Sequence, residues 1–233
     1  MFHTSSAIVL YITPHTDKTT LVHMYTREFG RVCAAVSGLH GRKSGAKAAL
    51  FGPLTPLLVT LRGKEGSWRV QEAGMHGSYH TIAMHHGKRS IAFFLAELIA
   101  HCVQEHDVDD SLFDFLYASV QTLERASFHP DFHLHFMVQL TQYLGFSPNL
   151  EDEGEFFDLQ DGVRRALRPN HSHYLLPDQA LPFIYLCQSR VGELHLQRAQ
   201  RQELLENLLS YYRLHIPYFG KLRSLDVLQE LFD

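Results

Sequence analysis

The chain has 233 residues, of which 45% are hydrophobic and 20% charged, with a formal net charge of −4. This composition is that of a globular protein with a hydrophobic core, and no apolar run reaches the roughly 18 residues that a membrane-spanning helix needs. The start, MFHTSSAIVLYITPHT, lacks the cationic stretch of a secretory signal. Cys33, Cys102 and Cys187 are widely spaced and form no C-x-x-C pair. They argue against a disulfide framework or a thiolate zinc site, and they favour a reducing, cytoplasmic location.

The first third of the sequence predicts five short strands. Apolar, alternating or β-branched runs are separated by turn-prone segments such as Phe29-Gly30 and KEG. The predicted strands cover residues 5–13, 19–26, 31–38, 55–63 and 67–75. SGAKAAL, between the third and fourth, predicts one or two helical turns. Five strands with this helix between the third and fourth are typical of an OB-fold barrel, although an SH3-like barrel would give a similar pattern.

From about residue 88 the apolar period becomes helical. Ile91, Phe94, Leu95, Leu98 and Cys102 follow the i, i+3, i+4 spacing of a buried helix face. The predicted helices cover residues 89–106, 110–126, 130–145, 177–189, 199–216 and 224–232. The sequence therefore predicts an α+β protein, with an OB-fold domain over residues 1–80 and an α-helical domain over 81–233. Residues 146–177 are expected to be irregular.

Charge is divided unevenly between these parts. Residues 1–90 carry 11 Lys and Arg against 4 Asp and Glu, whereas residues 91–233 carry 10 against 21. Solvated helix faces would explain this, but a basic small domain is also the electrostatic signature of a nucleic-acid binder. The densest cationic stretch, SGLHGRKSGAK, sets its charges among small residues, so that the backbone could approach phosphates. We expect the DNA contacts among the cations of this part: Arg31, Arg42, Lys43, Lys47, Arg62, Lys64, Lys88 and Arg89.

No catalytic motif is recognisable. The sequence has no G-x-S-x-G, no H-E-x-x-H and no phosphate-binding G-x-x-x-x-G-K-[ST]. His129 and His133 are four residues apart, but Pro130 and the absence of a spaced carboxylate or cysteine partner argue against zinc. The aspartates in 107–114 are expected to stabilise a helix start. We therefore expect no catalytic residue, no metal and no cofactor; a hydrolase that uses the histidine cluster is the weaker alternative.

Three segments together resemble the bacterial recombination mediator family RecO. TTLVHMYTREFGRVCAAVSGLHGRKSGAKAALFGPLTPLLVTL resembles its N-terminal domain, through Thr26–Arg31, Ser37–Lys47 and Leu50–Leu57. YLGFSPNL resembles the turn after its third helix. YYRLHIPYFGKLRSLDVLQELF resembles its C-terminal signature, with Lys221 and Arg223 at matching places.

The resemblance implies an OB-fold followed by a helical domain, and a non-enzymatic role in DNA repair and recombination. It implies binding of single- and double-stranded DNA, strand annealing, and help in loading RecA onto DNA coated by single-strand-binding protein. The implied partners are RecR, the acidic C-terminal tail of single-strand-binding protein and, indirectly, RecA, with no membrane and with a cytoplasmic, nucleoid-associated location. Lys221 and Arg223 are then candidate partner-binding residues. A protein–protein adaptor whose barrel binds peptide is the alternative.

The sequence departs from the family pattern in two places. Many members carry four zinc-binding cysteines after the LGF turn, whereas EDEGEFFDLQDG and its sequel contain none, so zinc is not expected. Many members also have Arg-Phe-Glu early in the preceding helix, where this chain has His135, Phe136 and Met137. An ordinary His titrates near pH 6.5, so contact of His135 with an acidic tail would depend on its protonation.

Overall fold

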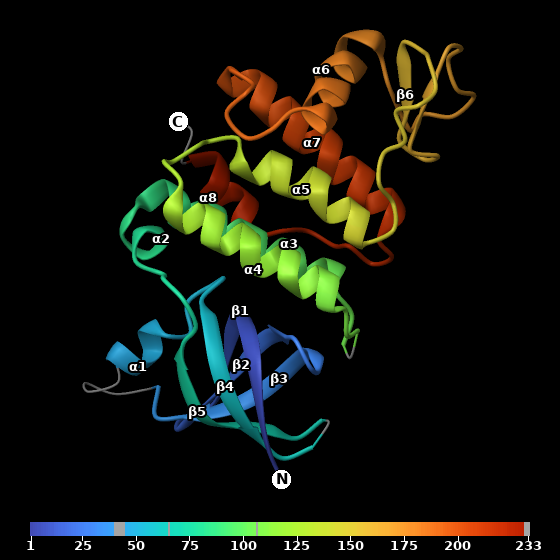
Figure 1. Cartoon of the computed structure of the whole chain (residues 1–233). Helices are drawn as coiled ribbons and strands as arrows, with labels where there is room; N and C mark the ends of the chain where they lie inside the picture. The colour runs from blue at the N-terminus through green and yellow to red at the C-terminus, as the bar shows by residue number, and fades with distance from the viewer. Residues whose placement is uncertain (40–44, 65, 106, 231–233) are drawn as a thin grey trace. The chain divides into compact units, whose positions relative to one another are not determined.

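The computed structural model describes residues 1–39, 45–64, 66–105 and 107–230 (Figure 1). The chain forms two compact units. The first combines Met1–Phe128 with Leu222–Leu228, and the second comprises His129–Lys221 and the segment from Gln229. The first unit therefore holds the β-barrel together with several helices.

The barrel is built from five strands and a short helix. They are β1 (Phe2–Thr16), β2 (Thr19–Thr26), β3 (Gly30–Ser37), α1 (Gly45–Ala49), β4 (Pro56–Arg62) and β5 (Trp68–Met75). The strands close in the order β1-β2-β3-β5-β4, with β4 returning to β1. The β3–β5 pair is parallel and the other pairs are antiparallel. This order, with a helix between β3 and β4, is that of an OB-fold, and it confirms the predicted barrel.

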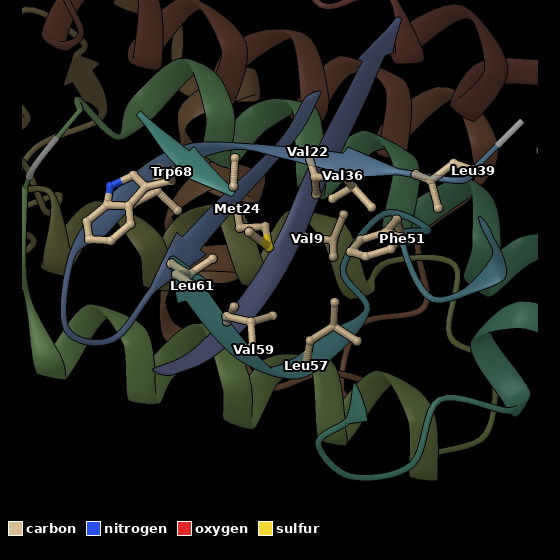
Figure 2. Close-up of a cluster of buried hydrophobic side chains, with 13 residues drawn as sticks. Val9, Val22, Met24, Val36, Leu39, Phe51, Leu57, Val59, Leu61 and Trp68 are labelled. Carbon is tan, nitrogen blue, oxygen red and sulfur yellow. The ribbon is translucent and has the colours of Figure 1, made fainter. Parts of the chain in front are cut away.

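Alternating side chains fill the barrel interior. In β4, Leu57, Val59 and Leu61 are buried while the residues between them are more exposed, as expected where every second residue of a strand faces a core. Figure 2 shows this core, with Trp68 near one end and Leu39 and Phe51 near the other. The two ends of the barrel are therefore closed by different side chains.

Strand β1 is buried on both of its faces over Ala7–Leu10. Ala7 and Val9 belong to the barrel core. Ile8, between them, points to the opposite face, because successive side chains of a strand alternate, and β1 also packs against helix α3. Leu10 lies at a register shift of the strand and is also buried. A continuous apolar run is what a strand covered on both faces requires.

Besides α1, the helices of the first unit are α2 (Thr81–Met84), α3 (His86–Cys102), α4 (Asp110–Arg125) and the start of α8 (Ser224–Glu230). Asp109 caps α4 by accepting a hydrogen bond from the amide of Leu112. Arg27 on the β2–β3 turn forms ion pairs with Asp110 and Asp114. These aspartates have structural roles at a helix start, as the sequence indicated.

Over residues 129–221, the second unit contains three helices and a small sheet. The helices are α5 (Phe132–Tyr143), α6 (Pro177–Gln188) and α7 (Arg198–His215). Strands β6 (Phe156–Asp158), β7 (Val163–Arg165) and β8 (Tyr174–Leu175) pair in the order β7-β6-β8. Residues 146–177 were expected to be irregular, and these three strands lie within that segment. Each is only two or three residues long, too short to show a periodic pattern in the sequence.

Two buried tyrosines join the helices of the second unit. The Tyr212 hydroxyl donates a hydrogen bond to the carbonyl of Met137 on α5, and the Tyr211 hydroxyl donates to the carbonyl of Phe146.

Across the described residues, no helix is both long enough and apolar enough to traverse a bilayer.

Candidate nucleic-acid interface

Three of the cations expected to contact DNA lie exposed on the barrel. Lys47 is on α1, where its ammonium donates a hydrogen bond to the carbonyl of Ser37 at 2.7 Å. Arg62 ends β4, and Lys64 follows in the β4–β5 turn. Exposure leaves these charges available to a polyanion, because surface cations can release counterions when they meet phosphates.

These cations occupy two places on the barrel. Lys47 lies on the helix that leads to Leu50 and Phe51, which pack at one end of the barrel core. Arg62 and Lys64 lie next to Trp68, which closes the other end (Figure 2). The structure therefore does not bring Lys47 together with Arg62. Arg42 and Lys43, in the same cationic stretch as Lys47, lie outside the described residues.

Arg31 faces the interior of the first unit. One of its terminal nitrogens, Nη1, donates to the carbonyls of Ala100 and Val103, at 2.8 and 3.1 Å. The other, Nη2, donates to the hydroxyl of Tyr11 at 3.0 Å. Its guanidinium thus ties β3 to the end of α3 and is not available to a phosphate. The expectation that Arg31 contacts DNA is corrected by this geometry.

Lys88 is also internal, with only 4% of its surface exposed. Its ammonium donates to the carbonyls of Glu124 and Ala126 and to the hydroxyl of Thr81. Burial lowers the pKa of this ammonium, and the Glu124 carboxylate opposes that shift. Lys88 is therefore removed from the expected DNA contacts, whereas its neighbour Arg89 is exposed on α3.

Arg69 is an exposed cation that the sequence reasoning did not select. It is the second residue of β5, directly after Trp68, and pairs in register with Arg62 on β4. The signal was present in SWRV, where an arginine follows a core tryptophan and must point to the opposite face of the strand.

The candidate partner-binding residues differ in their exposure. His135 lies on α5 with 3% of its surface exposed, and burial lowers the pKa of its imidazole below the ordinary 6.5. A neutral, buried ring does not offer a charge to an acidic partner, so the expected contact through protonated His135 is not supported. Lys221 and Arg223 are both exposed. The Arg223 backbone amide donates to the Glu97 carboxylate.

The histidines do not form a metal site in the part of the chain that the structure describes. No group of three or more metal-binding side chains gathers there. His133 lies inside the second unit, where burial first and the nearby Arg201 charge second lower its pKa to about 3. A buried neutral imidazole in α5 is a core residue, so the metal-dependent alternative gains no support.

The fold and these exposed cations define a class of protein: an OB-fold barrel with a basic surface, followed by a helical region. The family described as Recombination protein O N terminal matches residues 1–79, and the one described as Recombination protein O C terminal matches residues 88–226. The chain belongs to the RecO family of DNA repair proteins.

Curated relatives extend this similarity over the whole chain. The DNA repair protein RecO of Phocaeicola vulgatus is 36% identical over 241 residues, covering 100% of both chains. That of Bacteroides fragilis is 34% identical over 243 residues, again covering 100% of both. The RecO of Christiangramia forsetii is 30% identical over 240 residues, covering 100% of this chain and 99% of the relative.

Proposed function

We propose that this protein is a non-enzymatic recombination mediator that binds single- and double-stranded DNA and anneals complementary strands. It would help RecA load onto DNA coated by single-strand-binding protein. The observation that carries the proposal is the set of exposed cations on an OB-fold barrel, Lys47, Arg62 and Lys64, in a chain whose family is named for DNA repair.

The mechanism follows from charge neutralisation. Two DNA strands repel each other through their phosphates, and cations that displace condensed counterions reduce this repulsion. Because the exposed cations occupy two ends of the barrel, a bound strand would follow the barrel surface between them. Arg42 and Lys43, which lie in the same cationic stretch of the sequence as Lys47, would add to the phosphate contacts. Annealing by this route needs no nucleotide hydrolysis.

The protein partners would be RecR and the acidic tail of single-strand-binding protein. The half of the chain after residue 90 is acidic overall and would therefore turn away from DNA. Lys221 and Arg223 are exposed local exceptions in this acidic half and are the proposed contacts for an acidic tail. We also propose that the chain divides functionally near residue 80, with DNA binding before this point and partner binding after it.

A salt titration of oligonucleotide binding tests the DNA-binding step. If Arg42, Lys43, Lys47, Arg62 and Lys64 all contact a single strand, log K should fall with log salt at a slope of roughly −3.5. Joint replacement of Arg42, Lys43 and Lys47 by Gln should flatten this slope by about 2. The matched control replaces the exposed Arg125, Arg190 and Arg213, which removes the same charge elsewhere.

An equal loss in both triple variants would show that only net charge matters and would contradict specific contact by the cationic stretch. Annealing of complementary oligonucleotides, measured with and without single-strand-binding protein, then tests the proposed strand-annealing step. Absence of binding to any bare oligonucleotide would favour the peptide-binding adaptor.

A further inference from the structure

Three side chains lie in one row across three adjacent strands of the barrel. Phe2 on β1 is the register partner of Arg62 on β4, and Arg62 is in turn the partner of Arg69 on β5. Directly paired residues of antiparallel strands project from the same face of a sheet. We call Phe2, Arg62 and Arg69 the Phe2 row.

The Phe2 row points outward from the barrel. The residue before each arginine, Leu61 or Trp68, belongs to the barrel core, so alternation sends Arg62 and Arg69 to the outer face. Phe2 is 61% exposed, so its ring is accessible from solvent. The Arg62 guanidinium lies over this ring, 5.8 Å from its centroid, within the range of a cation–π contact.

The two arginines of the row form a direct cross-strand pair of like charge. Such a pair destabilises a sheet, and in the part of the chain that the structure describes neither guanidinium forms an ion pair with a carboxylate. The sequence of this turn also holds Lys64 and one carboxylate, Glu65, which is outside the described residues. A phosphate placed between Arg62 and Arg69 would relieve their repulsion, since guanidinium groups bind phosphate oxygens with paired hydrogen bonds.

A packed aromatic cluster adjoins the row. Trp68 is 8% exposed, and its ring centroid lies 5.1 Å from that of Phe29 and 5.5 Å from that of His3. These rings flank the row in sequence, because His3 follows Phe2 and Trp68 precedes Arg69. The backbone that carries the row is therefore held by packed side chains, which reduces the entropy that binding must overcome.

We propose that the Phe2 row binds one segment of single-stranded DNA, with a base stacked on Phe2 and its flanking phosphates held by Arg62 and Arg69. An exposed ring beside two arginines that have no carboxylate partner among the described residues matches the chemistry of a single strand, which offers both free base faces and phosphates. A duplex keeps its bases stacked inside and offers only phosphates. The inference rests on the proposed function and adds Phe2 and Arg69 to the expected contacts.

Binding of the full chain to oligothymidylate of about 15 nucleotides tests the Phe2 row. Replacing Phe2 by Ala should weaken this binding by about 5- to 100-fold, the usual effect of removing one stacking ring. The same variant should bind an abasic oligonucleotide of equal length, or a duplex, as the unmodified protein does. Replacing Arg69 by Gln should flatten the single-strand salt slope by about 0.7. Phe93→Ala and Arg125→Gln are the matched controls, because both residues are exposed on helices away from the row.

Trp68 supplies an independent readout, because it is the only tryptophan of the chain and adjoins Arg69. Oligothymidylate should change its fluorescence in the unmodified protein and less so in Phe2→Ala. If the unmodified protein binds oligothymidylate and Phe2→Ala binds equally well, the Phe2 row proposal is overturned while the proposed function stands. If the unmodified protein binds no oligonucleotide at all, the proposed function itself fails.

Discussion

The ammonium of Lys88 donates a hydrogen bond to the backbone carbonyl of Glu124 at 2.9 Å, close to the C-terminus of α4. The Glu124 side chain in turn accepts hydrogen bonds from the amides of His80, Thr81 and Ile82 at the start of α2. The Lys88 ammonium thus satisfies a carbonyl at the C-terminal end of α4, and the Glu124 carboxylate satisfies amides at the N-terminal end of α2. Each charge complements the dipole of the helix end that it contacts. This pair joins α2, α3 and α4.

Replacement of Lys88 by Met should destabilise the first unit without changing DNA contacts. The change leaves the carbonyls of Glu124 and Ala126 without their charged donor, at a cost of about 2 kcal/mol in unfolding free energy. Urea denaturation measures the loss, and the single-strand salt slope should stay at its original value while the protein is folded. Arg89→Met is the control, with a change within about 0.5 kcal/mol because the residue is exposed. A flatter salt slope for Lys88→Met would return this lysine to the DNA contacts.

Stability in acid should depend on Glu124. Burial alone would raise the pKa of its carboxyl, but hydrogen bonds from the amides of Ile82, Thr81 and His80 outweigh burial and bring it to about 2 from the ordinary 4.5. Because the folded pKa is the lower one, the stabilisation is complete above pH 4.5 and is lost as the pH falls toward 2. Its size is about 3 kcal/mol.

Urea denaturation at several pH values between 7 and about 3 checks this sign. Glu124→Gln should be less stable at neutral pH and should lose less stability through the acid range. Glu72→Gln, at an exposed position of β5, is the control that should follow the unmodified protein. If the free energy of unfolding falls with pH in the same way for all three proteins, a group other than Glu124 governs the acid transition.

The barrel could be predicted from the sequence because its signals are local. Alternating apolar residues and tight turns placed β2 at its observed bounds, 19–26, and the other four strands close to theirs. Helix α2 was not predicted, because it has only four residues and is stabilised by Glu124, which lies more than 40 positions away in the sequence. A side-chain cap of this kind leaves no trace in the pattern of the helix itself.

The candidate site was harder to predict, because charge in a sequence does not show where it points. Arg31 and Arg62 both lie at strand ends, yet Arg31 bonds to carbonyls of α3 while Arg62 is exposed. Lys88 and Arg89 are adjacent in the sequence, yet Lys88 is buried and Arg89 is exposed, because a helix turns successive residues about 100° apart. Arg31 and Lys88 are each engaged by carbonyl groups of a segment that is distant in the sequence, and this contact is what the local sequence does not show.

The small sheet of the second unit should depend on Asp158 and not on a metal. This buried carboxylate accepts hydrogen bonds from the amides of Gln160 and Asp161, and its Oδ2 lies 3.2 Å from Nε2 of His171. It therefore joins β6 to the turn before β7 and to the segment before β8. Asp158→Ala should cost about 2 kcal/mol or more and should speed proteolysis within residues 154–175.

Chelation provides the complementary measurement for the small sheet. EDTA should leave the unfolding midpoint of the unmodified protein unchanged, because in the described residues no cluster of metal-binding side chains gathers here. Asp152→Ala, at an exposed position nearby, is the control for the proteolysis experiment. A midpoint lowered by EDTA and restored by zinc would contradict stabilisation by Asp158 alone.

Gly30 should tolerate no side chain, for two separable reasons. Its φ is +59°, which disfavours residues with a Cβ, and a Cβ there would lie 2.5 Å from the carbonyl oxygen of Asp107. Gly66 has a similar φ of +75° but open space around it, so Gly66→Ala reports the backbone penalty alone, about 1 kcal/mol. Gly30→Ala should cost about 2 kcal/mol more than Gly66→Ala in urea denaturation, because Asp107 must move with the start of α4. Equal costs for the two variants would show that the segment carrying Asp107 shifts freely, and that the β2–β3 turn does not hold it in place.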